Sequence, residues 1–351
     1  MGYQRTSTPK FFVDVGLLAR HHGMIDQSEE ATDDGGLFNL NPQKTKSLTL
    51  TDYGNSYTEY VKLGLNNSNG WLNSLSYVFI LGHKFYTHDM QMSIYPYRTD
   101  PAQSSFIIPR HTVNCDVDSS GGGVAEHHWI HPTNDGWCLV EFQNQSAQGF
   151  NRIQVRIDGV GSSTFDFGEV STGWSYTMPH SPELSLELSY ANESIKTQQT
   201  KGGHTLTNSS WHEPPMWLNL PQWMTNDSTT GITDFKGLTP ATRRTWKLSF
   251  SYLDDADILN SAYPGDTGRQ KGIMVGFTPL DDTQPYQFKG IIDSFFSKVV
   301  MGTANFKLPF IFQPDSTVDE YAICRINANS FELKQVANNV YNTSVEIVES
   351  F

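Results

Sequence analysis

Hydrophobic and polar residues alternate one by one along two segments in the middle of the chain. In 150–158 the apolar residues Ile153, Val155 and Ile157 are separated by polar or charged ones. In segment 184–190 leucine or tyrosine likewise alternates with serine or glutamate. Successive side chains of a strand point to opposite faces, so this period predicts half-buried strands of an antiparallel sheet. Glycine- and serine-rich clusters between such segments predict turns, and residues 46–195 are therefore expected to form a β-sandwich.

The second half of the chain carries one helical pattern among further strands. Within 290–302 the apolar residues recur at helical spacing, and Gly302 stands where a C-terminal cap belongs; the stripe consists of Ile291, Ile292, Phe295, Phe296 and Val299. Strands are expected at 246–252, around 321–325 and 331–333, and at 345–351. The first of these strands should place four aromatic or aliphatic side chains on one side: Trp246, Leu248, Phe250 and Tyr252.

Polar and irregular segments divide the chain into three parts. Residues 1–45 are predicted to be an N-terminal arm, because the acidic, glycine-rich stretch 26–36 has few apolar side chains to bury. The polar run 195–203 is interpreted as a linker between the sandwich at 46–195 and a smaller domain at 196–351. Two segments rich in proline or poor in aliphatic residues, 211–245 and 260–287, are predicted to be loop insertions in that second domain.

Composition narrows the classes of partner. Charged residues make up 17% of the chain, below the roughly 25% of an average soluble protein, and aromatic residues reach 13%. A net charge of −13 argues against binding to nucleic acid or to an anionic membrane surface. The longest apolar stretch, 77–81, is too short for a membrane helix, and the first residues lack the apolar core of a secretion signal.

The three cysteines are far apart in the sequence. Cys115, Cys138 and Cys324 show no C-x-x-C spacing, and their odd number leaves at least one unpaired. We interpret them as small buried hydrophobic residues. Synthesis and assembly in a reducing cytoplasm are therefore expected.

Two histidine clusters are weak candidates for a metal site. Their possible ligands are His83, His88 and Asp89 in one cluster, and His128 and His131 in the other. A zinc site needs three or four ligands that converge on one point. Consecutive side chains of a strand point to opposite faces, and so do two side chains five positions apart unless a turn lies between them. Such pairs cannot both bind one metal ion. Ordinary surface or interface histidines are the favoured interpretation, and no cofactor is expected.

No enzyme motif is recognisable. The sequence contains no G-x-S-x-G elbow, P-loop, dinucleotide-binding glycine pattern or H-E-x-x-H, and its adjacent acidic pairs lie in segments expected to be solvated loops. We expect no catalytic residue. Four tryptophans of the predicted sandwich could stack on sugar rings if they were exposed, although a place in the core or at a subunit contact is favoured; they are Trp71, Trp129, Trp137 and Trp174.

Two groups of motifs resemble known families. Segment 165–182, in which Gly168-Glu169 leads through Gly173 into an aromatic strand and a Pro-x-Ser-Pro exit, resembles the closing part of jelly-roll modules in phage virion proteins and carbohydrate-binding sandwiches. Residues 196–351 resemble the minor tail protein M and distal tail protein group of long-tailed bacteriophages. That resemblance rests on the order of several motifs: Lys201-Gly-Gly, 243–252, the predicted helix, Leu308-Pro-Phe-Ile-Phe, the strand with Cys324 and Arg325, and the closing strand.

These resemblances imply an all-β, mainly antiparallel protein with an N-terminal jelly-roll-like sandwich and a small C-terminal β-barrel that carries one helix. They imply a non-enzymatic structural subunit of a phage tail tip or baseplate, assembled in the host cytoplasm. Its partners would be other tail proteins and copies of itself in a ring, with sixfold symmetry expected. The alternative is a virion module that binds a receptor or glycan. Candidate assembly contacts are Trp217, Trp223, Phe310, Phe312, Tyr341 and Phe351.

Overall fold

Antiparallel strands make up most of the computed structural model, and every pairing between the described strands is antiparallel. The predicted all-β class is therefore confirmed. The structure describes residues 7–25, 38–40, 46–52, 57–64, 75–97, 108–118, 129–143, 152–160, 164–183, 187–192, 195–209, 242–254, 257, 294–327, 332–338 and 340–350.

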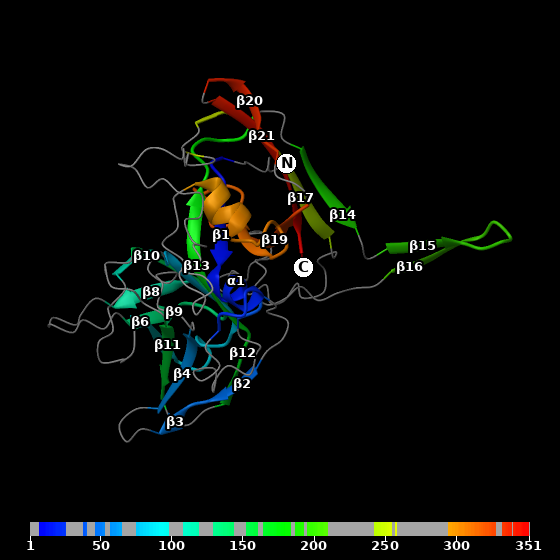
Figure 1. Ribbon diagram of the computed structural model, residues 1–351. Coiled ribbons are helices and arrows are strands. Elements are labelled where there is room, and N and C mark those ends of the chain that lie inside the picture. Colours follow the sequence, from blue (N-terminus) through cyan, green and yellow to red (C-terminus); the bar gives the residue numbers. More distant parts are fainter. Residues whose placement is uncertain are drawn as a thin grey trace.

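The largest element is a sheet of eleven strands that draws on both halves of the chain (Figure 1). Strands from the predicted sandwich region and from the predicted second domain hydrogen-bond into this one sheet. In spatial order they are β14 (Glu187–Asn192), β17 (Thr242–Asp254), β21 (Val340–Glu349), β19 (Ala322–Ile326), β18 (Phe310–Gln313), β1 (Lys10–Asp14), β13 (Glu169–Thr177), β5 (Tyr77–His83), β10 (Gly136–Gln143) and β7 (Ile108–Val113), with β20 (Lys334–Ala337) paired to β21.

A second sheet has six strands, all from the predicted sandwich region. Its order is β3 (Thr51–Asp52), β4 (Tyr57–Gly64), β11 (Arg152–Gly159), β6 (Gln91–Tyr97), β9 (Trp129–Pro132) and β8 (Cys115–Asp118). Two separate pairs join β2 (Lys46–Thr49) to β12 (Thr164–Phe167) and β15 (Ile195–Gln199) to β16 (Thr205–Ser209). The described helices are α1 (Val15–His21) and the π-helix η5 (Phe296–Met301).

The alternating pattern correctly located the inner face of β11. Ile153, Val155 and Ile157 are buried in one hydrophobic cluster together with Val78 and Ile80 of β5, so the two sheets share a core. The polar face of β11 is also partly covered, since Gln154 and Asp158 are 7% and 6% exposed. On that face the carboxylate of Asp158 accepts a hydrogen bond from Thr58 Oγ1 at 2.8 Å.

Strand β1 corrects the prediction that residues 1–45 form an arm. Lys10–Asp14 pairs with β13 on one side and β18 on the other, and so lies near the middle of the large sheet. Both faces of β1 are covered: Phe11 belongs to the core shared with the second sheet, and Phe12 belongs to a cluster on the opposite face. A strand buried on both faces has no alternation to mark it. The acidic stretch 26–36 lies outside the described residues.

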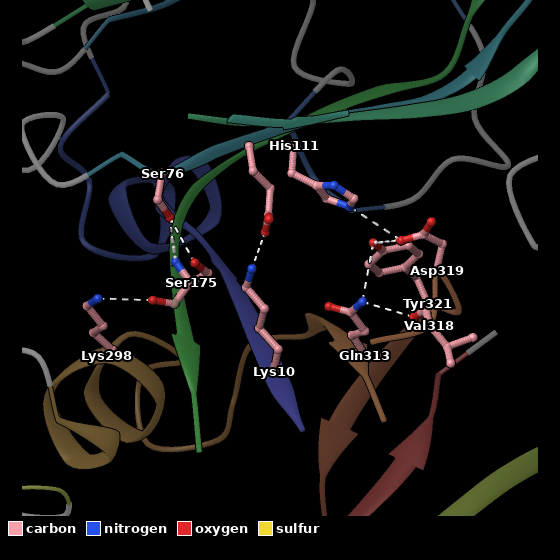
Figure 2. A network of polar contacts seen from close by, with 10 residues as sticks. Lys10, Ser76, His111, Ser175, Lys298, Gln313, Val318, Asp319 and Tyr321 are labelled. Carbon is pink, nitrogen blue, oxygen red and sulfur yellow. Dashed lines mark hydrogen bonds and ion pairs between the residues drawn. The ribbon is translucent and has the colours of Figure 1, made fainter. Parts of the chain in front are cut away.

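The large sheet curls strongly around its second cluster. Tyr321, just before β19, contacts the ring of Trp137 on β10 with centroids 5.3 Å apart. Five strand spacings separate β19 from β10 in the sheet, which would be roughly 24 Å in a flat one. The sheet must therefore curl strongly to bring these two rings into contact. Figure 2 shows that the parts of the sheet around β7 and β19 approach each other. His111 of β7 lies 3.4 Å from Asp319, which precedes β19.

The described strands do not close this curl into a barrel. The expected small barrel within 196–351 is also not formed by the strands described there, because β17, β18, β19, β20 and β21 all continue the large sheet. The curl instead uses strands from both predicted domains, including β5 and β10. The jelly-roll assignment and the domain boundary at 195/196 remain predictions.

The predicted helix packs directly on β1 and β13. Of the expected segment 290–302, residues 294–302 are described, and Phe296–Met301 forms a π-helix. Its Lys298 carbonyl accepts a hydrogen bond from Trp174 Nε1 at 2.9 Å. Gly302 ends the helix as predicted, but with φ −63° rather than a left-handed conformation. A Cβ at Gly302 would lie 2.2 Å from the Lys298 carbonyl oxygen and 2.8 Å from Val13 Cγ1, so the helix backbone and close packing on β1 both favour glycine here.

A buried carboxyl group lies where β1 enters α1. Asp14 is 1% exposed and accepts a hydrogen bond from the backbone amide of Leu17 at 2.8 Å, as an N-cap does. Burial raises the pKa of Asp14 to about 6, and its hydrogen bonds, including one with Ser171, only partly oppose this shift. The folded protein therefore binds the Asp14 proton more tightly than the unfolded chain does.

Asp14 should make the folded state lose stability as the pH rises from about 4 to about 6. Below this window the carboxyl is protonated in both states, and above it the buried carboxylate opposes folding by about 3 kcal/mol. Asp14→Asn should remove that dependence, so the free energy of unfolding of the wild type minus that of the variant should fall by this amount between pH 3 and pH 7. Denaturant titrations at several pH values measure it. Parallel profiles would refute the prediction, and Asp116→Asn, at an exposed position, is the control.

Candidate assembly surface

The described histidines of the two candidate clusters do not converge. His83 is completely buried, and its ring stacks on Phe85 with centroids 4.7 Å apart. Burial lowers the pKa of His83 to about 4, so it is neutral at physiological pH. A turn separates it from half-buried His88 and exposed Asp89, and His131 is exposed on β9. Within the described ranges no three histidine, cysteine or acidic side chains are placed to hold a metal ion, and His128 lies outside those ranges.

The residues predicted to be assembly contacts differ in how far they are buried. Phe310 and Phe312 are completely buried in β18, where both rings pack against Phe11 at 5.5 and 5.2 Å. They belong to the core of this chain, which corrects their assignment as contacts with a partner. Tyr341 is half-buried on β21. The remaining candidates, Trp217, Trp223 and Phe351, lie outside the described residues.

Tyr252 is a candidate that the sequence pattern assigned to the wrong face. Strict alternation along β17 predicts it beside buried Trp246 and Phe250, yet 83% of its surface is exposed. The reason is a β-bulge: Phe250 pairs with Thr343 and Leu253 with Tyr341, so β17 has one more residue than β21 in this interval. Leu253 takes the inward position. Tyr252 has φ 59°, an unfavourable conformation for a tyrosine.

Tyr252 lies on a three-stranded projection, which we call the strand tip. At the start of β21 the strand has β17 on one side and β20 on the other, because Tyr341 pairs with both Leu253 and Gln335. Figure 1 shows β20 and this end of β21 at the top of the molecule. All four residues of β20 are exposed, including Val336 at 47%. The strand tip therefore presents apolar side chains to solvent on an extended backbone.

The second projecting element is the hairpin of β15 and β16, which we call the arm. The interpretation of 195–203 as a linker is corrected here, because Ile195–Gln199 pairs in register with Thr205–Ser209 around a turn in which Gly203 has φ 82°. Among the described strands these two pair only with each other. The arm extends far from the rest of the molecule in Figure 1, and Leu206 on it is 58% exposed.

The opposite end of β21 is fixed by an ion pair between half-buried Arg244 and buried Glu349. Arg244 on β17 binds Glu349 through Nε and Nη2, each 3.0 Å from a carboxylate oxygen, and also binds Glu320. Its guanidinium lies 5.0 Å from the centre of the Trp246 ring. Burial alone would lower the pKa of Arg244, but the hydrogen bonds and charge of Glu349 raise it above its usual value. Arg244 is therefore charged, and this cluster holds β17 and β21 in register beneath the strand tip.

The tryptophans considered for sugar stacking are mostly internal. Trp137 and Trp174 are 5% and 0% exposed. Trp129 is half-buried, with the guanidinium of Arg156 5.3 Å from its ring centre. Trp71 lies outside the described residues. None of the three described tryptophans thus offers a fully open ring face to a sugar.

Comparison of the chain with protein-family models, with curated proteins and with solved structures gave no match. Neither α1 nor η5 has the length and apolar character needed to cross a membrane, and these are the described helices.

Proposed function

We propose that this chain is a non-enzymatic structural subunit of a tailed-phage virion, which assembles with copies of itself into a ring near the tail tip. The order of motifs across 196–351 supports the location in the tail. The sequence resemblance is also the source of the expected sixfold symmetry and of the other tail proteins as neighbours. The proposal that the chain assembles rests on a structural observation, the two projecting elements that we call the arm and the strand tip.

The arm is the stronger of the two observations. A two-stranded hairpin alone is marginally stable in water, because it has no second layer on which to bury side chains. This hairpin pairs with no other described strand and exposes most of its described residues. A surface of a neighbouring subunit would supply the missing layer. Leu206 on the arm would lose exposed apolar area in that contact.

The strand tip supports the same proposal from a different feature. An exposed aromatic residue in a left-handed conformation costs about 1–2 kcal/mol relative to an ordinary one. Such strain is most often retained where the displayed side chain has a function. Large aromatic side chains are also the residues most enriched at the centres of protein interfaces. Tyr252 meets both conditions and is proposed to contact a neighbouring copy.

Tyr252→Gly should separate assembly from folding. Glycine adopts φ 59° without strain, so the free energy of unfolding of the isolated chain should stay the same or rise by up to about 1 kcal/mol. Self-association should nevertheless weaken about tenfold or more, because an aromatic contact is lost. Sedimentation velocity over a range of concentrations measures the association. Tyr86→Ser, which removes a tyrosine that is 62% exposed near the second sheet, should leave association unchanged.

Two results would contradict the proposal. One is a chain that stays monomeric at high concentration and is also absent from rings in native tail particles imaged by electron microscopy. The other is equal weakening of association by Tyr252→Gly and Tyr86→Ser, which would show that the strand tip is not a specific contact.

A further inference from the structure

Cys115 and Cys138, which are 23 positions apart in the sequence, both belong to the core that the two sheets share. The chain leaves the large sheet at the end of β7 and enters the six-stranded sheet at the start of β8. Asn114 connects the two strands with φ 58°. Val113, the last residue of β7, pairs with Leu139 on β10. Cys115 therefore starts β8 next to the segment of β10 that contains Cys138.

The contacts of the two thiols agree with this placement. Cys115 Sγ donates a hydrogen bond to the carbonyl oxygen of Leu139 at 3.5 Å. The two thiols are also close enough to interact electrostatically. Both cysteines are buried in the same hydrophobic cluster, at 5% and 0% exposure. Cys324 is elsewhere, beside Glu349 and Arg244.

We propose that Cys115 and Cys138 form a redox-dependent disulfide that joins the six-stranded sheet to the large sheet. The inference is independent of the proposed function, because it rests only on the adjacency of two thiols on two sheets. In a reducing cytoplasm the pair would remain a dithiol, and in an oxidising medium it would become a covalent link. Cys324 would keep its free thiol in both conditions.

The oxidant we name is a small-molecule disulfide of the glutathione class. The thiolate of Cys115 attacks one sulfur of that disulfide, which forms a mixed disulfide and releases one small thiolate. The thiolate of Cys138 then attacks Cys115 Sγ and releases the second small thiol. Two protein thiols are oxidised and one small disulfide is reduced to two thiols, so electrons and protons balance.

The order of attack follows from the position of the two residues. Cys115 begins β8, which is an edge strand of the six-stranded sheet, and its only described partner strand is β9. Edge strands open locally more easily than central ones. Cys138 lies on β10 between β5 and β7, and burial raises the pKa of its thiol well above the usual value. Cys115 is therefore the first to react, and Cys138 resolves the mixed disulfide.

The test uses the full chain, folded, with and without oxidised glutathione. After oxidation the protein is denatured and alkylated, and intact mass gives the number of free thiols. We expect three free thiols before oxidation and one afterwards, with a cross-linked peptide pair containing Cys115 and Cys138. We also expect a Tm about 5 °C or more above that of the reduced chain, because the bond closes a loop of more than twenty residues.

Three variants make the test specific. Cys324→Ser should retain the oxidation and the Tm shift, whereas Cys115→Ser and Cys138→Ser should each lose both. Three free thiols after oxidation, a bond to Cys324, or a lower Tm in the oxidised protein would each overturn the proposal. The thiol count of the wild-type chain decides the result even if a serine variant does not fold.

Discussion

Replacing Phe295 with alanine is expected to lower the free energy of unfolding by about 3–5 kcal/mol. Phe295 is 1% exposed and lies just before η5. Its ring makes edge contacts with Phe11 at 5.4 Å and with Tyr176 at 5.9 Å. The substitution leaves a cavity between the helix and two strands of the large sheet, and the curled sheet has little freedom to collapse into it.

Phe296→Ala is the matched control, because the same residue type is removed one position later from a half-buried site. Its cost should be clearly smaller. Urea denaturation of both variants, followed by tryptophan fluorescence, measures the difference. Equal costs for the two variants, or no loss in Phe295→Ala, would mean that the helix does not depend on its packing against β1.

The sequence located two strands of the structure well. β11 is the clearest case, since Ile153, Val155 and Ile157 are all in the shared core. β19 was also located correctly, at Ala322–Ile326. The strand expected around 331–333 is found slightly later, at Lys334–Ala337, on an edge where no buried face constrains the pattern.

The sequence could not predict which strands lie together. β1 was assigned to an arm because its apolar run is short and is followed by the acidic stretch 26–36, yet it pairs with two strands that are distant in the sequence. The curl of the large sheet has the same origin. It depends on contacts such as that of Trp137 with Tyr321, which are separated by more than 180 positions. Local periodicity carries no information about such pairs.

The candidate assembly surface was found only in part. Aromatic residues were correctly considered as contacts, but Phe310 and Phe312 turned out to be core. Exposed Tyr252 was missed because neither glycine nor asparagine marks the bulge in Ser251–Tyr252, so alternation predicted an inward side chain. The arm was interpreted as a linker from its polarity, although Gly202-Gly203 between two β-compatible runs is a hairpin signal that sequence reasoning could have used.

Replacing Glu349 with alanine should destabilise the fold by about 3 kcal/mol, because it leaves the largely covered Arg244 guanidinium without its main partner. The side chains of Arg244 and Glu349 are 16% and 4% exposed. Glu320 cannot replace Glu349 fully, since its side chain is 42% exposed and binds through a single nitrogen. The loss should appear as a lower urea midpoint with an unchanged slope.

The double variant Arg244→Met, Glu349→Leu distinguishes an unpaired buried charge from a simple loss of contacts. If the cost of Glu349→Ala arises from the charge left on Arg244, replacing both partners by apolar residues of similar size should recover most of the stability. Glu320→Ala should cost about 1 kcal/mol or less, as is usual for a partly exposed ion pair. A double variant as unstable as Glu349→Ala would instead mean that the ion pair itself, and not its burial, keeps β17 and β21 in register.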